Sequence, residues 1–201
     1  DALAQFDSAL RLTEVPGGLH CHGYDDSRAQ RWSDPATGRS AAVWARAMGW
    51  LAMALVDALA LLPEDATTRP LRARLSGLLT AVAARQSASG LWYQVLDAQD
   101  LPGNYLESSA SAMFAYAFLR ASRFGLAPDL RDAGLHALAA LTARTGAQGL
   151  GGICEVAGLG TVGGPYRDGS PGYYLTERVV TDDAKGVGPL MMAWAEAQYA
   201  P

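Results

Sequence analysis

The segment from Trp44 to Trp50 carries the residues with the clearest chemical character, two tryptophans on either side of Arg46. Arg46 and Trp50 are four positions apart, so in a helix they share one face. The helix dipole opposes a cation in the first turn and favours an anion there. A ligand carboxylate held by the guanidinium group and the helix N-terminus would supply that anion. Because flat tryptophan faces lie beside the arginine, the segment indicates a site for a sugar ring with an acidic group.

Each of these residues also has a structural interpretation. In that alternative Arg46 forms an ion pair with Asp34 or Asp26, and the two tryptophans are core aromatics of a buried helix. His22 lies in the preceding loop, where a single histidine is more often a structural hydrogen-bond donor than a catalyst. His20 lies two positions before His22, and we expect only one of the two to point into the cavity.

Aromatic and carboxylate side chains recur in two later loops, a combination that suits carbohydrate. They include Trp92, Tyr93, Tyr105, Glu107, Tyr173, Tyr174, Glu177 and Asp183, and the amide of Gln94 lies among them. The sequence contains no nucleophile elbow, phosphate-binding loop, dinucleotide fingerprint or metal-ligand motif. We therefore expect neither a cofactor nor a metal.

Composition limits the class of protein and its partners. The 201 residues suffice for one domain, and 50% of them are hydrophobic. A net charge of −4 without a basic run argues against nucleic acid, and no apolar run reaches the ~18 residues that cross a membrane. Cys21 and Cys154 lack a metal-ligand spacing, so we expect reduced, buried thiols. We expect a cytoplasmic protein, since a secreted or periplasmic location would need a signal before residue 1.

A repeated pattern places these residues on common elements. Three times a helical stretch leads to a Gly-Leu pair, then a long loop, then a helix of small and apolar residues. The pairs are Gly18-Leu19, Gly90-Leu91 and Gly149-Leu150. The apolar periodicity predicts one-sided helices at 1–12, 70–86 and 129–144, and helices that are apolar nearly all round at 42–62, 108–124 and 187–199.

The links between helices alternate between short and long, which sets the architecture. Helices joined by short links lie antiparallel, so the three long loops gather at one end, above the N-termini of the inner helices. The pattern predicts an all-α fold of six main helices in alternating outer and inner layers, a single domain over 1–201 that forms half of a helical toroid. We expect its open side to expose the flanks of inner helices, such as Leu51 to Leu62 and Met113 to Leu119.

Six motifs spread along the chain resemble one known family. They are His22-Gly-Tyr-Asp25, Arg31-Trp-Ser-Asp-Pro35, Trp44-Ala-Arg-Ala-Met-Gly-Trp50, Asn104-Tyr-Leu-Glu-Ser-Ser-Ala-Ser-Ala-Met113, Tyr173-Tyr-Leu-Thr-Glu177 and Asp182-Asp-Ala-Lys-Gly-Val-Gly188. Together they resemble the unsaturated rhamnogalacturonyl hydrolases of glycoside hydrolase family 105, which are related to the unsaturated glucuronyl hydrolases of family 88. The resemblance extends over essentially the whole chain.

The resemblance implies an (α/α)6 barrel and a substrate that ends in a 4,5-unsaturated uronic acid, as left by lyases that cleave pectin (rhamnogalacturonan). The implied reaction is hydration of the C4=C5 double bond, after which the hemiketal opens and the neighbouring sugar leaves. His22, Trp44, Arg46 and Trp50 are implied to bind the unsaturated sugar, with Arg46 at its carboxylate. The family's proton donor is an aspartate in a segment before residue 1, so no catalytic residue is implied within this chain.

The chain therefore resembles the C-terminal half of such an enzyme. Besides the oligosaccharide, we expect the missing N-terminal half or a second copy of the chain as a partner. The alternative is a non-catalytic half-barrel that binds carbohydrate or acts as a scaffold.

Overall fold

The computed structural model describes residues 2–161 and 163–199 and is mainly helical. Residue 1, which the first predicted helix included, lies outside the described residues. The six predicted helices are present, with bounds that differ by up to three residues from the predicted ones. They are α1 (Ala2–Thr13), α2 (Ala45–Leu61), α3 (Arg69–Ala83), α4 (Ser108–Arg123), α5 (Arg131–Arg144) and α7 (Ala184–Ala197). A 3-10 turn, η1 (Pro128–Leu130), precedes α5, and a short helix, α6 (Pro171–Tyr174), lies in the last long loop.

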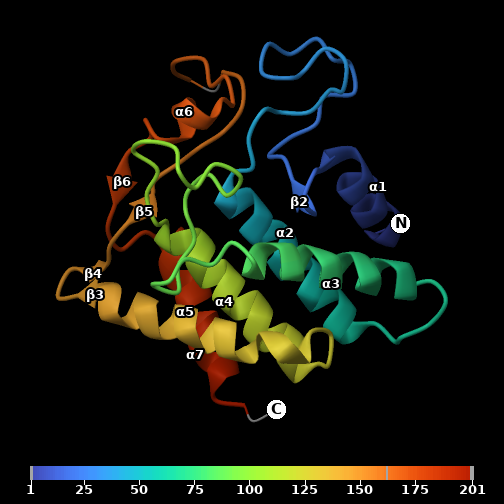
Figure 1. The fold of residues 1–201 in the computed structure, drawn as a ribbon, viewed down its shortest axis with the longest axis vertical. Helices are drawn as coiled ribbons and strands as arrows, with labels where there is room; N and C mark the ends of the chain where they lie inside the picture. The colour runs from blue at the N-terminus through green and yellow to red at the C-terminus, as the bar shows by residue number, and fades with distance from the viewer. Residues whose placement is uncertain (1, 162, 200–201) are drawn as a thin grey trace.

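Helix α4 occupies the middle of the inner layer. It packs against α2 on one side, against α7 on the other and against α5 in the outer layer (Figure 1). Residues 108–119 are all buried as a result. The expected exposure of Met113 to Leu119 is therefore wrong, because the open flanks of the layer belong to α2 and α7. On α2 the side chain of Leu61 is 80% exposed.

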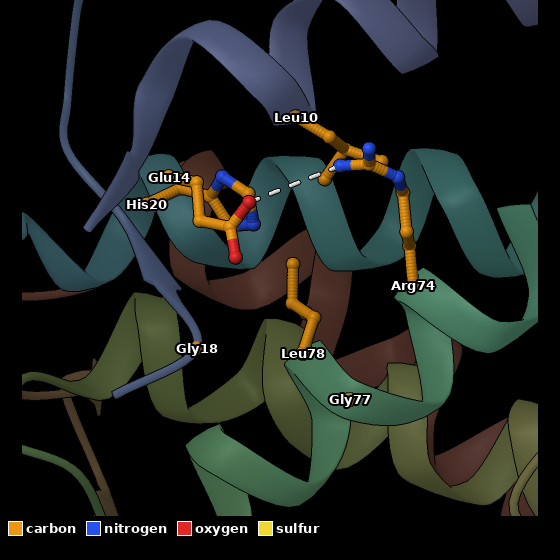
Figure 2. Close-up of a pocket in the computed structure, with 7 residues that line it drawn as sticks. All are labelled: Leu10, Glu14, Gly18, His20, Arg74, Gly77 and Leu78. Carbon is orange, nitrogen blue, oxygen red and sulfur yellow. Dashed lines mark ion pairs between the residues drawn. The ribbon is translucent and has the colours of Figure 1, made fainter. Parts of the chain in front are cut away.

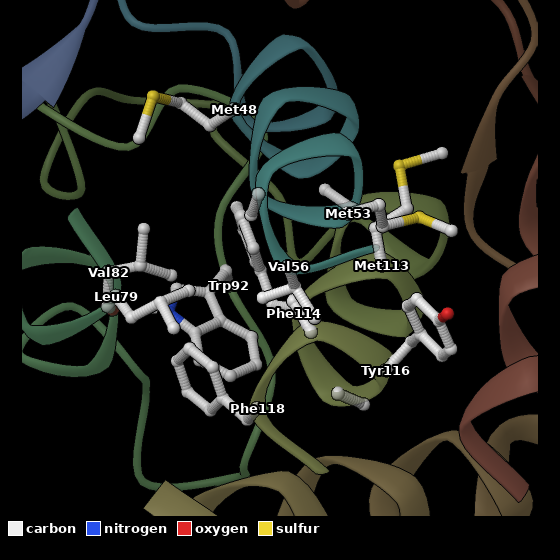
Figure 3. Packing of buried hydrophobic residues seen from close by; sticks show 14 of the residues in the cluster. Met48, Met53, Val56, Leu79, Val82, Trp92, Met113, Phe114, Tyr116 and Phe118 are labelled. Atoms are coloured by element: carbon white, nitrogen blue, oxygen red, sulfur yellow. Dashed lines mark hydrogen bonds between the residues drawn. The ribbon is translucent and has the colours of Figure 1, made fainter. Parts of the chain in front are cut away.

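The core lies between α2, α3 and α4 and includes an aromatic group. Trp92, from the second long loop, lies between the side chains of α3 and those of Phe114 and Phe118 on α4 (Figure 3). Its ring centroid is 5.1 Å from that of Phe114 and 5.6 Å from that of Phe118, both in edge-on arrangements. The indole N–H donates to the carbonyl oxygen of Val82. Trp92 thus belongs to the core and not to a ligand site.

The Gly-Leu pairs have a common physical cause. Gly18, Gly90 and Gly149 have φ angles of +75°, +88° and +94°, which glycine adopts more readily than other residues. The leucine that follows each of them is buried. The pair therefore makes a sharp turn shortly after each outer helix has ended, and its leucine anchors the following loop in the core.

Short antiparallel strand pairs, which the sequence did not predict, accompany two of these turns and join two parts of the third long loop. The pairs are β1 (Glu14–Val15) with β2 (Leu19–His20), β3 (Thr145–Gly146) with β4 (Gly149–Leu150), and β5 (Ile153–Cys154) with β6 (Val179–Val180). Two residues are too few for an alternating pattern to show in the sequence.

The long loops gather at the N-terminal ends of α2, α4 and α7, as predicted (Figure 1). They also bind one another: the Ala45 N–H donates to the Gln94 carbonyl at 3.0 Å, and the Gln94 side-chain amide donates to the Tyr174 carbonyl at 3.2 Å. Among the described residues, no helix combines the length and apolar character that crossing a membrane needs.

Candidate functional site

An open cleft of about 640 Å³ lies at the N-terminal ends of α2 and α7. Three of the four predicted sugar-binding residues line it, Trp44, Arg46 and Trp50. The other lining residues come from the third long loop and the start of α7. They are Glu155, Val156, Ala157, Asp183 and Lys185.

Arg46 is buried, and its guanidinium group is held by the elements around it. Nη1 donates to Ser109 Oγ at 3.1 Å and to the carbonyl oxygen of Cys154, and it lies 3.9 Å from Oε1 of Glu107. The guanidinium carbon lies 4.7 Å from the centroid of the Trp44 ring, as a cation–π contact. The structural alternative of an ion pair with Asp34 or Asp26 is thus wrong about the partner, which is Glu107.

The same guanidinium group also faces the cleft. Within residues 2–161 and 163–199, all side-chain hydrogen bonds of Arg46 use Nη1, so Nε and Nη2 have no partner in the protein, although the side chain is only 2% exposed. Arg46 is the second residue of α2, so the free N–H groups of that helix add to its positive potential. An anion that entered the cleft would meet both.

His22 lies behind Trp44 and outside the residues that line the cleft. Its ring centroid is 4.6 Å from that of Trp44, and it lines a separate hollow of about 170 Å³ with Thr13, Ala47 and Leu51. Burial, and then the charge of Arg46, lower the pKa of His22 to about 4. The imidazole is therefore neutral near pH 7 and supports the tryptophan by contact.

His20 does not line the cleft. It borders the hollow that His22 lines and also a second small hollow between α1 and α3, near Glu14 and Arg74, which form an ion pair (Figure 2). Its Nδ1 is 3.0 Å from the hydroxyl of Thr13. Of the two histidines, only His22 is next to the tryptophan of the candidate site.

Tyr174 and Gln94 fix the position of Trp44, a role that the sequence did not reveal. The Tyr174 ring stacks on the indole with a centroid distance of 5.9 Å and an interplanar angle of 17°. The indole N–H donates to Gln94 Oε1 at 3.2 Å. Both supporting residues are fully buried, so Trp44 forms a rigid wall of the cleft. The sequence indicated Tyr174 and Gln94 only as members of the loops that are rich in polar and aromatic residues, and not as supports of Trp44.

Two carboxylates line the cleft, and each is paired with a cation. Glu155 lies 3.0 Å from Arg178, and Asp183 lies 2.7 Å from Lys185. Burial raises the pKa of Asp183, but hydrogen bonds from the side chain and backbone of Lys185 outweigh it and leave the pKa below its usual value. Asp183 also caps the N-terminus of α7. Within the described ranges, no group of three or more His, Cys, Asp or Glu residues is arranged to hold a metal ion, and both cysteines are free and buried.

A sequence model of Glycosyl Hydrolase Family 88 matches residues 1–200. The chain belongs to this family. Protein Atu3128 of Agrobacterium fabrum is 60% identical over 208 residues, which cover 98% of the chain and 89% of that protein. The unsaturated rhamnogalacturonyl hydrolase YesR of Bacillus subtilis is 31% identical over 128 residues, or 61% of the chain and 33% of that protein.

A solved family 105 glycoside hydrolase from C. acetobutylicum superimposes with a TM-score of 0.90 and 39% identity. The match covers 98% of the family 88 chain but 57% of the solved one. The chain thus has the fold of the (α/α)6-barrel enzymes of families 88 and 105 and spans little more than half the length of that structure. The resemblance that the six motifs indicated is confirmed.

Proposed function

We propose that residues 1–201 form the uronate-binding half of a glycosidase that acts on pectin-derived oligosaccharides with a 4,5-unsaturated uronic acid at one end. The main support for this proposal is the position of Arg46. It lies at the N-terminus of α2 and lines one cleft together with Trp44 and Trp50. The proposed reaction is hydration of the C4=C5 double bond, which the resemblance to the unsaturated rhamnogalacturonyl hydrolases implies; the relative YesR carries that name.

The cleft fits the distinctive features of this substrate. The carboxylate of the uronate is bound by the free nitrogens of Arg46 and by the end of α2. The exposed face of Trp50, whose side chain is 48% exposed, is available to the sugar ring. Because the carboxylate is conjugated with the C4=C5 bond, fixing it also fixes the plane of the reacting carbons.

The chemistry needs a proton donor, and both carboxylates that line the cleft are paired with a cation. An acid protonates C4, water adds at C5, and the resulting hemiketal opens and releases the neighbouring sugar. Ordinary glycosidases protonate the leaving oxygen instead. The lowered pKa of Asp183 keeps it ionised near neutral pH, and Asp25 accepts hydrogen bonds within its own loop from Ser27 and Gln30. A donor from another part of the barrel fits this arrangement.

The edge of α7 is the surface where we expect the rest of the barrel to pack. Met191 and Trp194 are 66% and 60% exposed, and both line a mostly apolar groove of about 460 Å³ between α5 and α7. Such a surface usually meets a partner. The C. acetobutylicum structure supports a helical complement as that partner, since part of its chain has no counterpart here.

A non-catalytic sugar-binding half-barrel is the second candidate. The relative Atu3128 favours it, because the chain covers 89% of that protein, so that relative is also short beside the solved barrel. The two candidates share the cleft and differ only in the proton donor.

The experiment compares an unsaturated uronide with its methyl ester, which keeps the double bond but loses the negative charge. Binding to the 201-residue chain is measured by calorimetry, and hydration by the loss of the ultraviolet absorbance of the conjugated bond. We expect the acid to bind about ten-fold or more tightly than the ester. Equal binding of both would contradict the uronate site.

The hydration assay then separates the two candidates. We expect the chain alone to bind without hydrating, since general acid catalysis contributes about 10²–10⁴-fold, and activity to appear when the remaining half of the barrel is supplied. Full-rate hydration by a monomer of the 201 residues would show that an acid within the chain, with Asp183 tested first, is the proton donor. If the sugar binds but is not hydrated, both by the chain alone and after the remaining half of the barrel is supplied, the non-catalytic half-barrel is favoured.

A further inference from the structure

Glu107 is a fully buried carboxylate at the point where the loops meet the inner helices. Its Oε2 accepts the N–H of Ala110 at 2.6 Å, which caps the N-terminus of α4. Its Oε1 accepts the N–H of Cys154 at 2.9 Å. The Ser109 hydroxyl donates to the same carboxylate at 2.8 Å and accepts from Arg46. One side chain thus connects α4, strand β5 and the guanidinium group of the cleft.

Glu107 and Arg46 hold the two sides of residue 154. Arg46 Nη1 donates to the carbonyl oxygen of Cys154, while the N–H of Cys154 donates to Glu107. The three residues that follow, 155–157, form one wall of the cleft. The buried ion pair therefore fixes the starts of α2 and α4 to the loop that lines the cleft.

A capping role alone does not explain a glutamate here. Helix N-caps favour Ser, Thr, Asp and Asn, whose short side chains reach the N–H two or three residues on. The extra methylene of Glu107 lets one oxygen cap α4 while the other reaches the N–H of Cys154. The longer side chain is what the second contact requires.

We propose that Glu107 is a positioning residue that clamps Cys154 and, through Ser109, sets the orientation of the Arg46 guanidinium group toward the cleft. Glu107 does not touch the ligand. It keeps the wall formed by 155–157 in place and leaves Nε and Nη2 of Arg46 as donors for an anion. The part of this inference that concerns the anion rests on the proposed function, whereas the clamp on Cys154 does not.

Glu107→Asp separates the clamp from the cap. The shorter side chain keeps the negative charge and the capping of α4 but cannot also reach Cys154. Loss of a buried hydrogen bond makes local opening roughly ten-fold or more favourable, so we expect the buried thiol of Cys154 to be alkylated about ten-fold faster. Peptide mapping separates Cys154 from Cys21, which bonds within the first loop to Gly23 and serves as an internal control.

Two results would overturn the clamp. One is unchanged protection of Cys154 in Glu107→Asp. The other is an equal rise for Cys21 and Cys154, which would mean that the substitution loosens the whole chain. A second variant, Glu107→Gln, keeps the length but sets an amide N–H against a backbone N–H, and should also expose Cys154 and not Cys21.

Binding supplies a readout that a purely structural role would not change. We expect Glu107→Asp to weaken binding of the unsaturated uronide about ten-fold and binding of its methyl ester much less, because the orientation of Arg46 matters only for the carboxylate. If Cys154 becomes reactive while acid and ester bind equally in the unsubstituted chain, the proposed function fails and the clamp stands. If the unsubstituted chain prefers the acid and Glu107→Asp keeps that preference in full, the positioning role fails.

Discussion

Nδ1 of His22 lies 2.8 Å from the phenolic oxygen of Tyr174, a hydrogen bond that joins the first long loop to the last one. Both rings contact Trp44, so the tryptophan wall of the cleft depends on contacts between segments far apart in the sequence. The bond forms in an environment that lowers the pKa of His22 to about 4.

This lowered pKa predicts a specific pH dependence of stability. In the unfolded chain a histidine has a pKa of about 6.5. Between pH ~6.5 and ~4 the unfolded chain binds a proton that the native protein does not, so stability falls as the pH falls through this window. His22→Gln should remove about 2–3 kcal/mol of this fall, measured by urea unfolding at pH ~7 and ~4.5. A stability difference between variant and unsubstituted protein that is the same at both pH values would contradict the pKa.

A pair of glycine substitutions tests the packing of α2 on α4. A Cβ on Gly49 would lie 2.7 Å from Sδ and 2.8 Å from Cβ of Met113, so Gly49→Ala forces the two inner helices apart. We expect a loss of about 1–3 kcal/mol in the free energy of unfolding. Gly77→Ala on α3 is the control, since nothing lies within 4 Å of its added Cβ; it should stabilise the protein by about 0.5–1 kcal/mol. Equal effects of the two substitutions would show that the helices are not in close contact.

The exposed edge of α7 predicts the behaviour of a dye that binds apolar surface. Trp194→Glu should reduce dye fluorescence at least about two-fold, because Trp194 is the largest exposed side chain of the groove. Val179→Glu, which removes an exposed apolar side chain of β6, should change it little. Sedimentation of the same proteins shows what covers the groove at the edge of α7. If the unsubstituted chain is a dimer and Trp194→Glu makes it a monomer, the partner is a second copy of the chain and not the other half of the barrel.

The sequence predicted the helices and their layers well, because the buried side of a helix carries apolar residues at the helical period. A helix apolar on every side, such as α4, must be covered on every side. The pattern did not show which inner helix is central, since that depends on how many neighbours each one has. The flank of Met113 to Leu119 was therefore expected to be exposed and is buried.

The candidate site was predictable in its residue types but less so in its contacts. The motif around Arg46 indicated an anion site, and the structure places Trp44, Arg46 and Trp50 in one cleft. The ion-pair partner was missed, because Glu107 comes from another loop and no local spacing marks it. Trp92 shows the reverse case: it looked like the other loop aromatics, but its neighbours place it in the core.

The most direct test of the uronate site is the effect of Arg46→Ala on the preference for the unsaturated acid over its methyl ester. A charge-assisted hydrogen bond contributes about 1.5–3 kcal/mol, so the substitution should lower affinity for the acid by roughly one to two powers of ten. In the assembled enzyme, its catalytic efficiency should fall by a similar factor. Because Arg46 also holds Ser109 and Cys154, the ester reports any general disturbance of the cleft, and its binding should change little. An unchanged ratio of acid to ester binding after Arg46→Ala would contradict the assignment of Arg46 to the uronate carboxylate.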